Sequence, residues 1–161
     1  MDRVVPAISI VTPAYNCEKT IPRTLASVMA QTFTDWEMII VDDGSIDNTR
    51  QIVENFVEPR IKYFYLAHQG RKAARSAGFE KSKGEMIVFL DGDDWWEANC
   101  LEKLHRALAN APADIAVAHC DFAYMDGNGN ILRRESSAFS DGPGLQTLVL
   151  RNPFVIHAGL V

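Results

Sequence analysis

The sequence predicts an α/β protein of the Rossmann-like kind, with a mostly parallel sheet and helices on both of its faces. Strand-like and helix-like segments alternate four times over about the first 120 residues, as in sheets built with crossover helices. Residues 87–90, Ile-Val-Phe-Leu, contain no polar break, which is typical of a strand buried on both faces. Polar residues follow several apolar runs, at the strand ends where such sheets bind ligands.

Each element is expected from its local pattern. Apolar and β-branched runs predict strands over residues 7–12, 36–41, 61–66, 87–90 and 115–119. Proline cannot donate to a sheet, so Pro13 is expected to end the first strand. Helices are expected from Thr20 onward, from Asp47 or Asn48 to Phe56, over 70–82 and over 99–109. Pro22 falls in the first turn of the first helix, where a missing N–H does no harm.

The pattern changes after His119. Residues 122–125 and 131–133 flank a Gly-rich turn and predict a hairpin, and 144–151 predict a short helix. Residues 154–161 are apolar and strand-like. Because chains seldom stop inside a buried strand, we expect 1–161 to be a single domain that is truncated. Its first part, 1–120, would be a nucleotide-binding half, and 121–161 the start of an acceptor-side half.

Composition narrows the class of protein. The chain is 47% hydrophobic and has a formal net charge of −5 with no basic run, so nucleic acid is not an expected partner. No apolar segment approaches the roughly 18 residues that span a membrane. The cysteines at 17, 100 and 120 match neither a disulfide framework nor a zinc spacing. We therefore expect inert packing cysteines and a cytoplasmic setting.

Three carboxylates, Asp91, Asp93 and Asp94, follow the most apolar strand. Acids bunched in this way repel one another unless a cation lies among them. Carboxylate oxygens suit Mg²⁺ or Mn²⁺, and such sites commonly share the metal with a substrate phosphate. Gly92 lets the backbone turn tightly and leaves room for a ligand. The alternative is an acidic surface turn whose acids cap the next helix.

Two further strand ends carry polar groups, at residues 12–16 and at Asp42-Asp43. Since the carboxyl ends of parallel strands share one edge of the sheet, all three sets are expected to meet there.

Four motifs resemble those of family-two nucleotide-sugar glycosyltransferases of the GT-A fold, in order and spacing, over roughly residues 7–100. They are I-S-I-V-T-P-A-Y-N at 8–16, V-D-D-G-S at 41–45 followed by D-N-T at 47–49, G-x-x-x-A-R-S-x-G at 70–78, and the segment 84–94. The resemblance implies a nucleotide diphosphate sugar donor, usually a UDP-sugar, with Mn²⁺ or Mg²⁺. It also implies inverting transfer of the sugar to a saccharide or other hydroxyl acceptor, as in polysaccharide assembly.

By this resemblance, the loop Thr12, Pro13, Ala14 and Tyr15 would cradle the nucleobase and ribose. Asp43 would accept a hydrogen bond from the uracil imide, while Asp42 would orient the loop or cap backbone amides.

The same resemblance assigns the diphosphate and metal contacts. Arg71 or Arg75 would meet the diphosphate or the loop carboxylates. Asp91 would reach the ribose hydroxyls or the metal beside Gly92, Asp93 would ligate the metal, and Asp94 would lie further out. The family usually has Asn where this chain has Ser76, so the usual contacts of that residue are not carried over.

The catalytic base is expected beyond Val161, so this chain would hold the donor site without it. Asp121 is the one weak candidate within the chain, just after the fifth strand. His157 stands in an apolar run and is expected to be structural. Trp95 and Trp96 could stack on a sugar, but at least one is expected to pack in the core.

Two other classes of protein remain open. The chain could be a donor-binding fragment or a degenerate, non-catalytic homologue. It could also be a haloacid-dehalogenase-type phosphatase, with Asp91 as nucleophile and Asp93 as acid/base. That family places the motif on its first strand, with Thr or Val where this chain has Trp95. The sequence does not predict the sugar, the acceptor or the oligomeric state.

Overall fold

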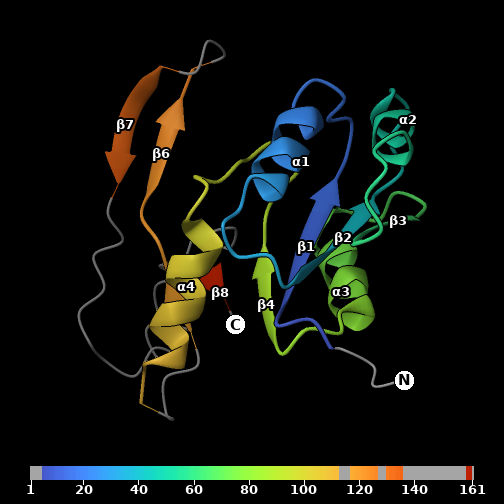
Figure 1. Cartoon of the computed structure of the whole chain (residues 1–161). Coiled ribbons are helices and arrows are strands. Elements are labelled where there is room, and N and C mark those ends of the chain that lie inside the picture. The colour runs from blue at the N-terminus through green and yellow to red at the C-terminus, as the bar shows by residue number, and fades with distance from the viewer. Residues whose placement is uncertain (1–4, 113–116, 127–129, 136–158, 161) are drawn as a thin grey trace.

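The structure is a computed structural model that describes residues 5–112, 117–126, 130–135 and 159–160. Its larger sheet has six strands in the order β3-β2-β1-β4-β8-β5 (Figure 1). The first four in chain order are parallel to one another: β1 (Ile8–Ala14), β2 (Trp36–Asp42), β3 (Ile61–Tyr65) and β4 (Met86–Phe89). Among the helices of these residues, none is long and apolar enough to cross a membrane.

Helices cover both faces of the sheet, as the sequence predicted. They are α1 (Ile21–Met29), α2 (Thr49–Glu54), α3 (Arg71–Lys81) and α4 (Cys100–Ala109). Buried side chains of α1, α2 and α4 form the larger core with one face of the sheet, and α3 packs on the other face (Figure 1). Close packing of α3 depends on Gly78, because a Cβ there would collide with the side chain of Val11.

The bounds of these strands and helices lie within two residues of those expected, but the prediction that Pro13 ends the first strand was wrong. Pro13 pairs with Val41 inside β1. Its carbonyl accepts the N–H of Gly92 at 3.2 Å, so its nitrogen faces the same side, where β4 has already ended at Phe89. The missing N–H therefore interrupts no ladder, and the strand continues through the proline.

The later elements are short. The expected hairpin is present as β6 (Phe122–Met125) paired with β7 (Ile131–Glu135), a two-stranded sheet of its own. In the larger sheet, β8 (Gly159–Leu160) runs antiparallel between β4 and β5 (Ala118–His119). The expected helix at 144–151, His157, which was expected to be structural, and the start of the fifth strand at 115 lie outside the described residues.

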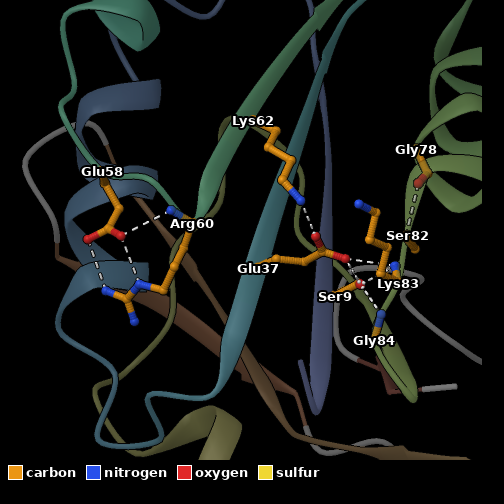
Figure 2. Close-up of polar contacts among 9 residues, drawn as sticks. All are labelled: Ser9, Glu37, Glu58, Arg60, Lys62, Gly78, Ser82, Lys83 and Gly84. Carbon is orange, nitrogen blue, oxygen red and sulfur yellow. Dashed lines mark hydrogen bonds and ion pairs between the residues drawn. The ribbon is translucent and has the colours of Figure 1, made fainter. Parts of the chain in front are cut away.

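A buried polar cluster ties together the amino ends of the strands. We call it the Glu37 network (Figure 2). The carboxylate of Glu37 accepts hydrogen bonds from the Ser9 hydroxyl at 2.7 Å, the Lys83 N–H at 2.7 Å and the Lys62 ammonium at 2.6 Å. Burial alone would raise the pKa of Glu37, but these hydrogen bonds outweigh it and hold the pKa below its ordinary value. The network fastens the turn between α3 and β4 to the sheet.

Candidate functional site

A cleft of ≈ 380 Å³ opens at the carboxyl ends of β1, β2 and β4, the edge where the sequence predicted a site. Its volume is within the range of pockets that hold small molecules. Twelve residues line it: Pro13, Ala14, Tyr15, Asn16, Cys17, Thr20, Asp43, His68, Arg71, Asp91, Gly92 and Asp93.

Most of the predicted site residues share this cleft, but three do not line it. Thr12 is fully buried, because alternation along β1 turns its side chain to the same face as Ile10. Arg75 lies behind the cleft, bonded to Asp91. Asp121, the weak candidate for the base, is an exposed residue after β5. The roles that the resemblance gives to these residues remain predictions.

Side-chain and backbone bonds hold the loop after β1 against the loop after β2. The Asn16 N–H donates to the Ser45 hydroxyl at 2.8 Å, and the Asn16 side-chain oxygen accepts the Ile46 N–H at 2.9 Å. One turn further, the Glu18 N–H donates to the Asp47 carboxylate at 3.0 Å. These bonds fix Tyr15 relative to the end of β2. The other oxygen of Asp47 accepts the N–H of Thr49, the first residue of α2. The N-cap itself is Asn48, whose side chain makes no capping bond.

The two adjacent acids at the end of β2 have different tasks. Asp42 accepts the Ser45 N–H at 2.8 Å and the Tyr63 hydroxyl at 2.6 Å, so it orients the loop, one of the alternatives expected for it. Burial and this bond to Asp42 both raise the pKa of Tyr63. Asp43 accepts the N–H groups of Gln69 and Gly70, each at 2.8 Å, and lines the cleft.

His68 is a cleft residue that the sequence analysis missed. Its ring stacks on Tyr15, with centroids 4.5 Å apart and planes 25° apart. Its Nδ1 lies 2.9 Å from both the carbonyl and a carboxylate oxygen of Asp43. His68 follows β3 by three residues, so the strand-end rule that selected the other loops could have found it. Tyr15 remains about half exposed, which leaves aromatic surface at the mouth of the cleft.

Asp91, Asp93 and Asp94 form an acid cluster, with one oxygen of each within 4.8 Å of the others, and Asp91 and Asp93 line the cleft. Asp91 is buried and paired with Arg75 at 2.7 Å and with Arg71 at 3.4 Å, whereas Asp93 is exposed. Three converging carboxylates on a turn that opens into a cleft are a donor set that fits a hard divalent cation. Figure 1 places the end of β4, which carries them, beside the end of β1.

The remaining expectations concern cysteine and tryptophan. Cys17 lines the cleft, but burial raises the pKa of its thiol to about 11 against the bond from Thr49, so it stays a protonated packing group at neutral pH. Trp96 is buried in the core, as expected for at least one of the pair. The guanidinium of Arg23 lies over the ring of Trp95, with its central carbon 4.2 Å from the ring centroid.

The chain belongs to glycosyl transferase family 2, whose family model matches residues 9–158. This membership rejects the phosphatase alternative. Among its relatives is an Escherichia coli protein named UDP-Glc:alpha-D-GlcNAc-diphosphoundecaprenol beta-1,3-glucosyltransferase WfgD. The two are 37% identical over 131 residues, which are 80% of this chain and 48% of the relative.

Solved glycosyltransferase structures confirm the fold. Residues 1–349 of S. aureus TarS in complex with UDP match with a TM-score of 0.71 and 27% identity, over 83% of this chain and 39% of that one. The mannosyltransferase PcManGT of Pyrobaculum calidifontis, in complex with GDP-Man and Mn²⁺, matches with a TM-score of 0.61 at 22% identity, over 71% of this chain and 35% of that one. The expected GT-A architecture is therefore present. The chain spans about half the length of the relatives that it matches.

Proposed function

We propose that the chain is the donor-binding part of an inverting glycosyltransferase that moves a sugar from a UDP-sugar to an acceptor hydroxyl with the help of Mn²⁺ or Mg²⁺. The observation that carries the proposal is the shared cleft: the exposed ring of Tyr15, the buried acid Asp43 and two carboxylates of the acid cluster line one hollow. TarS, a relative by structure, was solved with UDP, and WfgD is named for UDP-Glc.

The nucleoside would lie at the loops that follow β1 and β2. In this proposal Tyr15 stacks on the base, and Asp43 accepts its imide N–H. Each carboxylate oxygen has two lone pairs, so Asp43 can accept this bond while it keeps those from Gln69 and Gly70. Pro13 and Ala14 would supply backbone contacts, and Gly92 leaves room beside the ribose.

The diphosphate would lie over the acid cluster. Asp93 is the principal ligand proposed for the metal, because both oxygens of Asp91 already face Arg75 and Arg71. A bound divalent cation neutralises the charge that grows on the leaving diphosphate. Arg71, exposed at the cleft, would add a second positive charge there. The metal proposal rests on the carboxylates of this chain, since the likeness to the Mn²⁺-bound mannosyltransferase is one of fold.

The acceptor proton needs a carboxylate base. We propose that residues beyond Val161 supply this base and that 121–161 begin the acceptor-facing half. On this proposal the chain binds donor without efficient turnover. A non-catalytic donor-binding homologue is the second candidate, and a longer chain that transfers sugar would reject it. Cytoplasmic location stays a prediction.

Thermal unfolding with UDP, GDP or NAD, each with and without Mn²⁺, tests the donor proposal. UDP at a hundred times its Kd should raise the Tm by roughly 5–10 °C, and only when Mn²⁺ is present. Asp93→Asn should remove the Mn²⁺-dependent rise in Tm. Asp35→Asn, which changes an exposed acid outside the cleft, should keep it. Stabilisation by NAD and not by UDP, or the same shift without metal, would reject the proposal.

A further inference from the structure

Helix α1 is bonded to the turn that carries the acid cluster, residues 91–94, which we call the metal loop. The Thr20 hydroxyl donates to the Gly92 carbonyl at 2.9 Å. The Thr24 hydroxyl lies 2.7 Å from the Asp94 carbonyl and 3.1 Å from that of Gly92. These contacts join segments about 70 residues apart in the chain, so they are tertiary contacts and not part of either local structure.

Both threonine hydroxyls lie closer to carbonyls of the metal loop than to the local carbonyls that they also reach, which for Thr20 is that of Cys17 at 3.3 Å. Thr20 is the N-cap of α1, yet its side chain makes no capping bond. A threonine inside a helix usually donates back to the carbonyl four residues earlier. For Thr24 that distance, to the Thr20 carbonyl, is 3.4 Å, much longer than its 2.7 Å contact with the Asp94 carbonyl. Thr24 is also 1% exposed, so no solvent competes for its hydroxyl.

The two accepting carbonyls stand on either side of Asp93. The Gly92 carbonyl, held by Thr20, belongs to the peptide plane that precedes Asp93, and the Asp94 carbonyl, held by Thr24, belongs to the plane that follows Asp94. The turn that carries Asp93 is therefore restrained on both sides of this residue. The Asp94 N–H in turn donates to the Asp91 carbonyl at 3.0 Å, which closes the turn. Without such restraint, three acids within 4.8 Å of one another would spread apart through repulsion.

The same support continues past the metal loop. Gln31, directly after α1, donates to the Glu97 carbonyl at 2.8 Å and accepts the Leu101 N–H at 2.9 Å. The Thr32 N–H donates to the Ala98 carbonyl at 2.8 Å. The segment from the metal loop to the start of α4 is thus bonded along its length to α1 and to the residues that follow this helix.

We infer that Thr20 and Thr24 are positioning residues for the metal site: their hydroxyls hold the metal loop in the form that binds a divalent cation. The inference rests on the proposed function, because it assumes that the acid cluster binds metal. Partners that orient metal ligands in this indirect way typically change metal affinity 10- to 100-fold when they are removed.

The test is a titration of the chain with Mn²⁺, followed through the electron paramagnetic resonance of free Mn²⁺, with and without UDP. Thr24→Val keeps the shape of the side chain and removes the hydroxyl, and it should weaken Mn²⁺ binding about 10-fold. Thr24→Ser should stay within about threefold of the original chain, because it restores the hydroxyl. Ser27→Ala is the matched control: its hydroxyl bonds the Thr24 carbonyl inside α1 and does not reach the loop.

The outcomes separate the two proposals. If the unchanged chain binds no Mn²⁺ with UDP present, the metal site itself fails. If it binds and Thr24→Val binds equally well, only the positioning role is overturned, whatever the change in Tm. If Thr24→Val does not fold, Thr20→Val tests the same inference. This variant should fold, since Thr20 is partly exposed and has no capping bond to lose. A 10-fold loss in that variant supports the inference, and unchanged affinity overturns it.

Discussion

Strand β2 has a buried acid near each of its ends, and the two acids have similar bonds but different surroundings. Glu37, near the amino end, accepts a backbone N–H, a hydroxyl and a lysine ammonium (Figure 2). Asp43, just past the carboxyl end, accepts two backbone N–H groups and lies beside His68. Both acids fasten a distant turn to the sheet, so these bonds alone do not distinguish a structural acid from a binding acid.

The difference lies in what surrounds each acid. At the amino end, backbone packs against backbone: a Cβ on Gly84 would lie 2.5 Å from the Ser9 nitrogen. At the carboxyl end, Asp43 opens on a cleft in which carboxylates outnumber guanidinium groups. A buried, hydrogen-bonded acid thus indicates a ligand site only where a cleft lies beside it and where the negative charges that line this cleft outnumber the positive ones.

The largest expected effect tests the packing difference with two glycines. Gly84→Ala places a methyl against backbone atoms and should lower the free energy of unfolding by about 3 kcal/mol. Gly70→Ala, at the cleft end, meets no atom within 4 Å, so its cost, about 2 kcal/mol, comes only from a backbone with φ +95° and ψ 159° that side chains other than glycine rarely adopt. Urea unfolding of both variants measures the difference. Equal losses would show that the amino end is no more tightly packed than the cleft.

Glu37→Gln should lower the free energy of unfolding by about 2 kcal/mol at pH 7, because it removes the acceptor of a charged bond from the interior. The value is below that of a fully buried pair, since the Lys62 side chain is 38% exposed. Glu80→Gln, at an exposed position on α3, is the control.

The same substitution has a pH signature. The pKa of Glu37 is lower in the folded chain than in the unfolded chain. Its contribution is therefore complete above its ordinary pKa of about 4.5 and is lost as the pH falls through the lower, folded value. The gap in stability between the original chain and Glu37→Gln should shrink below pH 4.5. A gap that widens in acid would contradict the network.

Local pattern predicted most of the fold and much of the site. Apolar runs and helical spacing set the strands and helices, and the strand-end rule brought Tyr15, Asp43 and the acid cluster to one edge. Pro13 was misjudged because whether a strand tolerates proline depends on where its neighbour ends. Thr12 was assigned through the motif, but its side chain is fully buried within β1 and does not line the cleft.

What the sequence did not reveal are contacts between distant segments. His68 reaches Asp43 across 25 positions, through the pairing register of β2 and β3. The bond between Thr24 and the metal loop spans 70 positions. The place of His68 after β3 is only a weak local signal, since a histidine after a strand has many ordinary explanations, and a threonine inside a helix gives no signal of such a contact.

Asp42 and Asp43, the two acids at the carboxyl end of β2, can be compared through their effects on UDP affinity. Asp43→Asn puts an NH₂ group against one of the two N–H donors, that of Gln69 or that of Gly70, so it should disturb the loop at 68–70 and weaken UDP binding about 10-fold, or about 1.4 kcal/mol. Asp42→Asn can still bond Tyr63, whose hydroxyl both donates and accepts, and should change UDP affinity less than threefold. Calorimetric titration with UDP and Mn²⁺ measures both. Equal losses would mean that Asp43 has no special role toward the base.

The smallest expected effect separates a surface acid from a buried one. Glu58 pairs with Arg60 at 2.8 Å, and these bonds lower its pKa to about 2 (Figure 2). Arg60 is also held 3.8 Å above the ring of Trp36, so Glu58→Gln leaves it in place and should cost about 0.5 kcal/mol at pH 7. Salt screens the attraction between the two charges of an ion pair, but Glu37 also accepts neutral hydrogen bonds from the Ser9 hydroxyl and the Lys83 N–H. We therefore expect 1 M NaCl to remove a larger share of the loss at Glu58 than of the loss in Glu37→Gln. Chemical unfolding at both salt concentrations measures the two effects. Equal salt sensitivity would mean that the Glu37 network is as open to solvent as the surface pair, and the contrast between the two ends of the sheet would not hold.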